Sequence, residues 1–352
     1  MAKKISIGDI AKALGVSTTS VSFVISGRAK EKGVSAKMIA LVENYIKEIG
    51  YKPNLLAQSL RTGKTMTIGL MVEMISDYFF SKIAYHIEGL AYANGYKILY
   101  CSTDNDAEKT AALINLFMER KVDGFIITPP AGIENEVKNL MEAGVPVVLF
   151  DRYFPEIDTN YVILDNFNGT YKAIKELIRD GFRKIAYIGI DSPQTQMNDR
   201  EGGYLKGLEE NSLPALIKRI PFGQDSKQTV KDIVKFMKAN KQLEAVVFAT
   251  NYLALSGIQA FDEAGLKIPD DVAVVAFDDH MMFDLYRPTI TAIAQPIEQL
   301  AKQAFDVLLS QLNDESQQIN TYKVVVPPKF IIRDSTEAVK NKKVSAVSKS
   351  ES

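Results

Sequence analysis

The chain has 352 residues, of which 46% are hydrophobic and 9% aromatic, a composition typical of globular proteins with two or three domains. Its formal net charge is −1, yet residues 1–64 carry 11 lysines and arginines against four acids, a net charge of +7 that leaves −8 for the remainder. It has no run of 18 apolar residues and no apolar segment near its N-terminus, which argues against a membrane span and a secretory signal. We therefore expect a soluble, cytoplasmic protein.

Residues 7–25 predict two short helices that pack against each other. Apolar residues at helical spacing from Ile7 to Leu14 form one face of the first helix, which Gly15 ends. Ser17 can cap the second helix, whose inner face is also apolar. Two such helices joined by a tight turn with glycine form a helix-turn-helix, a common DNA-binding motif. An ordinary pair of surface helices in a small bundle is the alternative.

The outward face of the second helix carries small hydroxyl side chains, which let a helix approach DNA and bond phosphates or base edges. The candidate DNA-binding residues of this helix are Ser17, Thr18, Thr19, Ser22 and Phe23. A third helix between Ser35 and Gly50 completes a headpiece that we place at residues 1–50. Its positive charge predicts salt-dependent contact with phosphates.

Residues 51–65 predict a hinge. Pro53 interrupts the chain, and Asn54 can cap a helix of about two turns that ends near Leu60. Such a short helix is marginal alone in water, and its leucines have no apolar partner within the segment. It could therefore order on DNA and wedge apolar side chains between base steps of the minor groove. The alternative is a plain linker whose leucines pack on the next domain.

From residue 66 to residue 336, apolar strand-like runs alternate with amphipathic helical stretches. Apolar strands that are each followed by a helix predict an α/β domain with doubly wound parallel sheets in two halves, which bind ligands at the carboxyl ends of their strands. The loop after the first strand, ISDYFF, offers aromatic rings and an acid, which suit a sugar or a planar ring better than a pyrophosphate. The polar residues 337–352 predict a disordered tail.

Cysteine and histidine are too sparse to predict a metal site. The chain holds one cysteine, Cys101, and two histidines that are far apart, His86 and His280. We expect no metal site, no cofactor and no disulfide within the chain.

The segment IGDIAKALGVSTTSVSFVISG, followed by SAKMIALVENYIKEIGYKPNLLAQSLRTGKTMTIGLMV, resembles the start of a LacI/GalR-family transcriptional regulator, and the resemblance covers nearly the whole chain. It implies a homodimer that binds a pseudo-palindromic double-stranded DNA operator. It also implies control by a small-molecule effector, usually a sugar or a nucleoside-like metabolite. Regulators of this family are more often repressors than activators.

The resemblance also implies roles for single residues of the headpiece. Thr18, Thr19 and Phe23 match positions that face bases, and Leu60 matches the residue that wedges into the minor groove. Phe23 is a departure, since that position is often arginine; phenylalanine can touch a thymine methyl group but cannot make the bidentate guanine contact. To these contacts we add Arg28 and Lys30 of a basic loop, and Asn54 and Ala57 of the hinge.

For the rest of the chain the resemblance implies the type I periplasmic-binding-protein fold, with two lobes joined by three crossovers, which we expect near Leu164, Pro288 and Tyr322. The positions that match the effector cleft are Asp77, Phe79, Phe80, Asp151, Arg200, Asn251, Tyr252 and Asp278. Asp165, Asn166 and Gly169 match a further family motif, which could equally cap a helix between the lobes. Phe79 or Phe80 could belong to the core, and the pair Asp151-Arg152 could serve only to lock the lobes.

Two other classes of protein compete with a regulator. A solute-binding protein of a transporter could have the same two lobes, but the basic headpiece and the missing signal segment argue against it. An enzyme would need a nucleophile–base pair or a metal cluster, and no such pattern is recognisable. We therefore expect a DNA-binding regulator and no enzymatic activity.

We predict that Leu60→Ala weakens operator binding without changing effector affinity, because only the DNA-bound state would use the leucine wedge. Operator binding by gel shift and effector binding by calorimetry measure the two effects separately. Equal operator affinity in the mutant and the parent would remove the wedge role.

Overall fold

The computed structural model describes residues 5–51, 63–313 and 321–337. They form two compact units, which divide between Thr65 and Met66. We call the first unit the headpiece and the second the two-lobed unit. The hinge residues Asn54, Ala57 and Leu60 lie outside the described residues, as does the predicted tail from residue 338 onwards.

The headpiece contains three helices: α1 (Ile7–Leu14), α2 (Thr18–Ile25) and α3 (Ala36–Glu48). Each begins at a serine whose side chain accepts a hydrogen bond from the backbone N–H three residues further on; these serines are Ser6, Ser17 and Ser35. Gly15 ends α1 at a φ of 65°, a left-handed conformation that glycine adopts without steric cost. The capping residues thus fix where each helix starts and where the turn between α1 and α2 lies.

The apolar faces of the three helices meet in one small core. Ile10 of α1, Val21 of α2 and Val42 of α3 are all completely buried there. Because α2 uses Val21 and Val24 for this contact, its opposite face is left for solvent or a partner. The helix pair expected from the sequence is therefore present.

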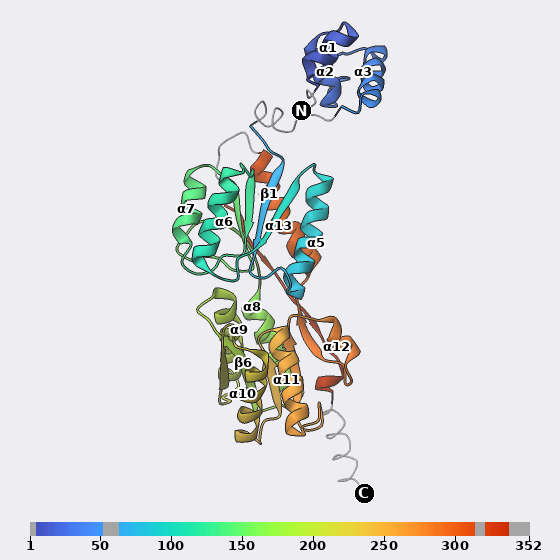
Figure 1. Cartoon of the computed structure of the whole chain (residues 1–352). Helices are drawn as coiled ribbons and strands as arrows, with labels where there is room; N and C mark the ends of the chain where they lie inside the picture. Colours follow the sequence, from blue (N-terminus) through green and yellow to red (C-terminus); the bar gives the residue numbers. More distant parts are fainter. Residues whose placement is uncertain (1–4, 52–62, 314–320, 338–352) are drawn as a thin grey trace. The chain divides into compact units, whose positions relative to one another are not determined.

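The two-lobed unit contains two six-stranded sheets (Figure 1). The strands of the first lobe are β1 (Thr67–Val72), β2 (Lys97–Ser102), β3 (Gly124–Ile127), β4 (Val147–Phe150), β5 (Asn160–Leu164) and β11 (Lys323–Val326). Those of the second lobe are β6 (Ile185–Asp191), β7 (Leu216–Pro221), β8 (Ala245–Phe248), β9 (Ala273–Phe277), β10 (Thr291–Ala294) and β12 (Lys329–Ile331). The spatial orders are β11-β5-β4-β3-β1-β2 and β12-β10-β9-β8-β6-β7.

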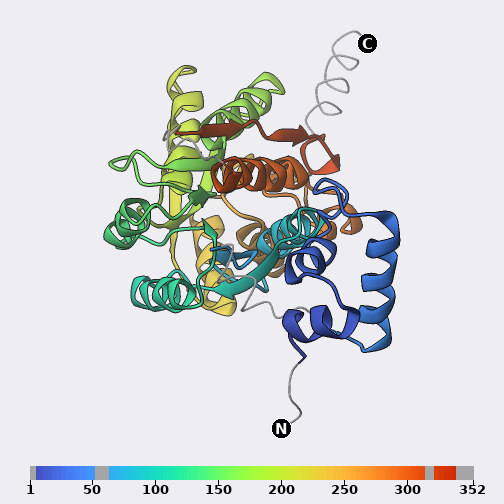
Figure 2. The same cartoon turned by 90° about the horizontal axis from the view of Figure 1, so that it is seen from above.

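Helices cover both faces of the first sheet. The helices of the first lobe are α5 (Tyr78–Ala93), α6 (Ala107–Glu119), α7 (Glu134–Glu142) and α13 (Ile297–Asn313). α6 and α7 lie on one side of the sheet, and α5 and α13 pack side by side on the other (Figures 1 and 2). In β3, Phe125 and Ile127 belong to one apolar cluster and Ile126 to the other, so this strand is apolar on both faces.

The second lobe repeats this plan. Its helices are α8 (Asn166–Arg179), α9 (Thr195–Glu209), α10 (Ser226–Ala239), α11 (Asn251–Ala264) and α12 (Met281–Leu285), with a short 3-10 helix at Asp334–Thr336. Strand pairing is parallel throughout the described sheets except that β12 runs antiparallel to β10. The doubly wound parallel sheets expected from the sequence are therefore confirmed. The antiparallel edge strand β12 enters its sheet directly from the first lobe without a helix between.

Three segments cross between the lobes. The first follows Leu164 at the end of β5, as expected. The second lies between Ala294 and Ile297, and the third between Val326 and Lys329. The expected crossovers at Pro288 and Tyr322 were placed too early, because β10 still pairs with β9 of the second sheet, and β11 still pairs with β5 of the first.

Two glycines let α9 approach α8 closely. A Cβ atom added to Gly203 would lie 2.2 Å from the carbonyl oxygen of Phe167, and one added to Gly207 would lie 2.6 Å from the side chain of Ile174. Since α8 begins directly after the first crossover, this contact fixes the start of the second lobe against α9.

We predict that Gly203→Ala destabilises the two-lobed unit by at least about 1–3 kcal/mol, because the methyl group would meet backbone that cannot move without separating the helices. Thermal unfolding should show a midpoint several degrees lower. Gly202→Ala is the matched control, since its Cβ would lie 3.4 Å from the ring of Phe167, an ordinary contact distance. Equal midpoints for the two variants would contradict the close approach.

Candidate functional site

The face of α2 that points away from the headpiece core carries the threonines singled out in the sequence. Thr18 and Thr19 are exposed. Ser17 is exposed but occupied as the helix cap, since its Oγ accepts a hydrogen bond from the N–H of Ser20 at 3.0 Å. Ser22 is half-buried, and Phe23 packs partly against the headpiece core. Thr18 and Thr19 are therefore the two exposed side chains of this set that do not cap the helix.

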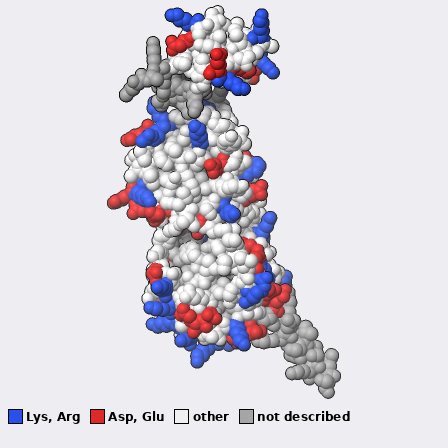
Figure 3. Space-filling model, turned by 45° about the vertical axis from the view of Figure 1, so that its right-hand side comes forward, with Lys and Arg blue, Asp and Glu red and all other residues white. Residues whose placement is uncertain are grey.

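The basic loop after α2 is anchored to the headpiece by its one apolar residue. Ala29 is buried in the core, while its neighbours Arg28 and Lys30 are exposed. The N–H of Arg28 donates to the carbonyl of Phe23 at 3.0 Å, so the loop continues directly from α2. Lysine and arginine side chains stand out at several edges of the headpiece surface (Figure 3).

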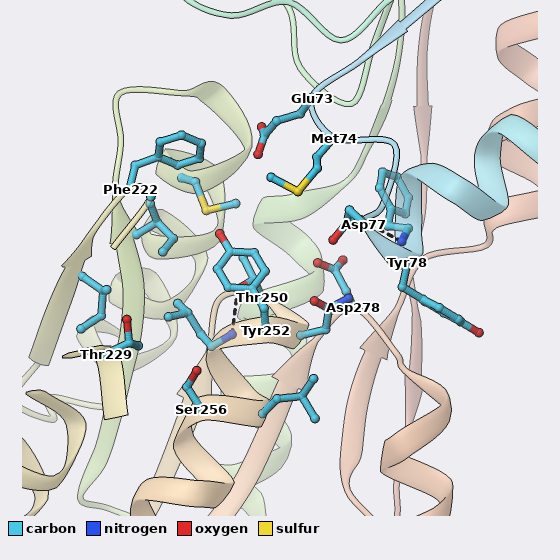
Figure 4. A pocket seen from close by; sticks show the side chains of 18 of the residues that line it. Glu73, Met74, Asp77, Tyr78, Phe222, Thr229, Thr250, Tyr252, Ser256 and Asp278 are labelled. Atoms are coloured by element: carbon cyan, nitrogen blue, oxygen red, sulfur yellow. Dashed lines mark hydrogen bonds between the residues drawn. The ribbon is translucent and has the colours of Figure 1, made fainter. Parts of the chain in front are cut away.

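A cavity of about 710 Å³ lies between the two lobes (Figure 4). It is bordered by the loops that follow strands of both sheets, as the doubly wound fold leads one to expect. All eight residues that the sequence assigned to an effector cleft line it: Asp77, Phe79, Phe80, Asp151, Arg200, Asn251, Tyr252 and Asp278. Residues up to 201 positions apart in the chain thus meet in one pocket.

Arg200 of α9 is the centre of the polar end of this cavity. Its side chain is almost completely buried, and its Nε donates to Oδ1 of Asn166 at 2.8 Å. One terminal nitrogen donates to the carbonyl oxygen of Ala249 at 2.7 Å and lies 3.4 Å from Oδ2 of Asp278. The guanidinium also stacks over the ring of Phe277, 3.7 Å from its centroid. The arginine is therefore held in one orientation before any ligand arrives.

Several carboxylates also lie at the polar end of the cavity. Asp278 accepts a second hydrogen bond from Nε2 of Gln295 at 2.5 Å. Asp77 caps α5 by accepting from the N–H groups of Phe79 and Phe80. Burial raises the pKa of Asp77, and the nearby charges of Asp278 and Glu73 raise it further. The cavity therefore holds more negative than positive charge.

Asp151 and Asp278 directly follow strands β4 and β9 and have left-handed backbone, with φ of 70° and 67°. Non-glycine residues seldom adopt this conformation, and it is concentrated at binding sites. Burial raises the pKa of Asp151 to about 6, against the lowering effect of Arg152 and Arg200. The backbone strain and the desolvated carboxyl group both mark the ends of these strands as a binding site.

Amide side chains bridge the lobes beside the cavity. Nε2 of Gln194 donates to Oδ1 of Asn105 at 2.8 Å, and Nε2 of Gln196 donates to Oδ2 of Asp151 at 3.3 Å. On another side, the rings of Tyr78 and His280 meet edge to face at 4.7 Å between centroids. The two lobes thus contact each other through groups that a ligand in the cavity could also reach.

Several alternatives raised by the sequence can now be compared with the geometry. Asp165 caps α8 and does not line the cavity, whereas Asn166 reaches the site indirectly through Arg200. Phe79 and Phe80 are both core residues and both border the cavity. Arg152 forms a buried ion pair with Glu73 at 2.5 Å, within the first lobe.

Sequence reasoning missed many further lining residues, among them Glu73, Gln194, Gln196, Met197, Phe222, Ser256, Gln259 and Gln295. Phe222 directly follows β7, so the rule that ligands bind at the carboxyl ends of strands could have found it. Ser256 and Gln259 follow Tyr252 at helical spacing, which becomes informative only once α11 is known to border a pocket.

We predict that Asp151→Asn raises the thermal stability more at pH 7.5 than at pH 4.5. A carboxyl group with a raised folded-state pKa contributes stability that is present below its ordinary pKa and is lost as the pH rises through about 6. Asparagine cannot ionise and accepts the left-handed backbone. Melting curves at both pH values test this, with the exposed Asp262→Asn as control; an equal change at both values would show that Asp151 is not desolvated.

The described part of the chain has no helix that is long and apolar enough to cross a membrane. No group of three or more His, Cys, Asp or Glu side chains that could hold a metal ion occurs among the described residues.

The headpiece and the two-lobed unit each match a known protein family. Residues 6–54 match the family model of bacterial regulatory proteins of the lacI family, and residues 174–336 match that of periplasmic-binding-protein-like domains. The HTH-type transcriptional repressor PurR of Pectobacterium atrosepticum is 32% identical over 338 residues, with 94% of this chain and 96% of PurR covered. The HTH-type transcriptional regulator DegA of Bacillus subtilis is 30% identical over 342 residues, covering 95% and 98%.

Solved structures with a similar fold match most of the length of this chain. The lac repressor dimer bound to operator and an anti-inducer superimposes with a TM-score of 0.84 at 23% identity, covering 96% of this chain and all of that one. A periplasmic binding protein/LacI transcriptional regulator from Alkaliphilus metalliredigens, solved with D-xylulofuranose, gives 0.67 at 27% identity, covering 78% of this chain and all of that one. The chain belongs to the LacI family of DNA-binding transcriptional regulators, as its sequence motifs suggested.

Proposed function

We propose that this chain acts as a homodimeric repressor that binds a pseudo-palindromic DNA operator, with an affinity set by a small carbohydrate in the cavity between its lobes. The observation that carries the proposal is that one chain combines a helix-turn-helix with a preformed cavity lined from two lobes. A ligand that touches both lobes can favour one arrangement of them over another.

The DNA contacts are assigned to the headpiece and the hinge. Thr18 and Thr19 are exposed on α2 and can reach base edges or phosphates, and Arg28 and Lys30 are exposed in the following loop. For Ser17 and Phe23 we propose contacts secondary to their roles in capping and packing, and for the half-buried Ser22 a contact through its hydroxyl group. The contribution of Asn54, Ala57 and Leu60 rests on the sequence and on its resemblance to the family.

The effector contacts are assigned to the polar end of the cavity. Arg200 and Asp278 form a fixed donor–acceptor pair, and Asp77, Asp151 and Asn251 supply further polar groups around it. Phe79, Phe80 and Tyr252 supply apolar surface, and a sugar offers both hydroxyl groups and an apolar ring face. The relative from Alkaliphilus was solved with a sugar, which supports this choice of ligand class.

Regulation then follows from a shift in population. A ligand bound by both lobes stabilises the arrangement in which both contact it, and this arrangement alters the positions of the two hinges of a dimer. The structure of the lac repressor dimer on its operator supports the dimeric state. We propose that the protein acts in the cytoplasm, where a DNA-binding regulator of a bacterial cell meets its operator.

An enzymatic role has less support. The relatives are transcriptional regulators. Three carboxylates could be imagined as catalytic, those of Asp151, Asp165 and Asp278, and the first accepts a hydrogen bond from Gln196. Asp278 is engaged by Arg200 and Gln295, and Asp165 caps a helix outside the cavity lining. We therefore propose that the protein binds its ligand and does not transform it.

The test is a selection from a random duplex DNA library with purified protein, with and without a mixture of common saccharides. We expect two inverted half-sites and a recovery that changes with the mixture. Arg200→Ala should select the same sequence but lose the saccharide response, because it removes the centre of the polar end. The control is Arg219→Ala, which deletes an exposed arginine of the same lobe and should respond as the parent does. No enriched sequence in either arm would contradict the proposal.

A further inference from the structure

The cavity extends well beyond the polar end. On α11, Tyr252, Leu255, Ser256 and Gln259 face it, a stripe at helical spacing that spans about 10 Å along the helix axis. Phe222, after β7, and Thr229 of α10 also line this part of the cavity. Figure 4 shows Tyr252 between the carboxylates of Asp77 and Asp278 on one side and Phe222 on the other. We call the part beyond Tyr252 the second compartment.

The second compartment differs in chemistry from the polar end. Met197, Ile220 and Phe222 provide apolar surface, and Ser256, Gln259 and Gln224 provide neutral groups that both donate and accept hydrogen bonds. No charged side chain among the described residues lines this part of the cavity. A neutral ring with hydroxyl groups, or an aromatic group linked to a sugar, matches such a surface.

The polar end disfavours a negative ligand. Four carboxylates line the cavity, from Glu73, Asp77, Asp151 and Asp278, and the one lining guanidinium among the described residues is that of Arg200. Arg152 pairs with Glu73 at 2.5 Å and with Asp151 at 3.8 Å, and Arg200 pairs with Asp278, so both arginines already have carboxylate partners. A phosphate would add charge of the same sign in a partly desolvated place. A cation would find each lining carboxylate already engaged, because Asp77 caps α5 and the two arginines pair with the other three.

We propose that the effector is an uncharged saccharide with more than one ring, either a disaccharide or an aryl glycoside. Its first ring binds at Arg200 and Asp278, and its second group lies in the compartment formed by Phe222, Thr229 and Ser256. This rests on the proposed function of the cavity as an effector site. It adds that the second compartment, and not the polar end alone, selects the effector.

The test uses the full chain without DNA and measures binding by native mass spectrometry and calorimetry. The probes are matched sets of common hexoses and pentoses, their disaccharides and 4-nitrophenyl glycosides, and their sugar phosphates, with amino sugars as cationic probes. The best ligand should be a disaccharide or an aryl glycoside that binds at least about tenfold more tightly than its monosaccharide and its phosphate. Equal or tighter binding of a monosaccharide, a phosphate or an amino sugar would overturn the proposal, as would no binding by any neutral saccharide.

Variants of the second compartment then test whether the second ring, or the aryl group, of the ligand binds there. Ser256→Met fills the second compartment and should weaken the two-ring ligand at least about tenfold while leaving its monosaccharide unchanged. Asp262→Met, on the exposed side of the same helix, is the matched control and should change neither. If Ser256→Met does not fold, Gln259→Met at an exposed position of the same stripe replaces it. An unchanged affinity for the two-ring ligand would overturn the assignment of the compartment.

The test of the ligand class measures saccharide binding without DNA, so its result does not depend on operator binding. If saccharides bind as described but leave operator affinity unchanged, the proposed regulation fails and the ligand class stands. If operator binding responds to a different class of ligand, the regulation stands and the ligand class fails.

Discussion

The polar end of the cavity depends on one buried cation. The guanidinium of Arg200 is closed off from solvent and is stable there only because Asn166, the carbonyl of Ala249 and Asp278 take up its charge and its hydrogen bonds. These partners come from α8 and from the ends of β8 and β9, so the arginine of α9 ties together the elements that border the cavity. The close approach of α9 to α8 at Gly203 sets the distance at which this is possible.

The same network is connected to two of the three crossovers. Asn166 is the first residue of α8 after the first crossover, and Gln295, which bonds Asp278, lies in the second. A ligand that alters the surroundings of Arg200 or Asp278 therefore acts directly beside the segments about which the lobes turn. We infer that this proximity, rather than a long chain of contacts, is the route by which occupancy of the cavity reaches the arrangement of the lobes.

The sequence predicted the local features well because each has a local physical cause. The helix starts at Ser17 and Ser35, the left-handed Gly15 and the apolar strand runs were recognisable from residues close in the chain. The eight predicted cavity residues meet in the structure because the family pattern carries information on distant positions. The crossovers after β10 and β11 were misplaced, since membership of a sheet is decided by the partner strand. The second compartment could not be foreseen, because Ser256 and Phe222 belong together only through the packing of α10, α11 and β7.

The proposed regulation requires that the cavity and the headpiece be energetically coupled. The most direct measurement is the affinity of the protein for its saccharide with and without a saturating operator duplex, by calorimetry at constant salt. We expect the operator to change saccharide affinity by the same factor by which the saccharide changes operator affinity, since coupling between sites is reciprocal. Identical saccharide affinities in the free and the DNA-bound protein would contradict it.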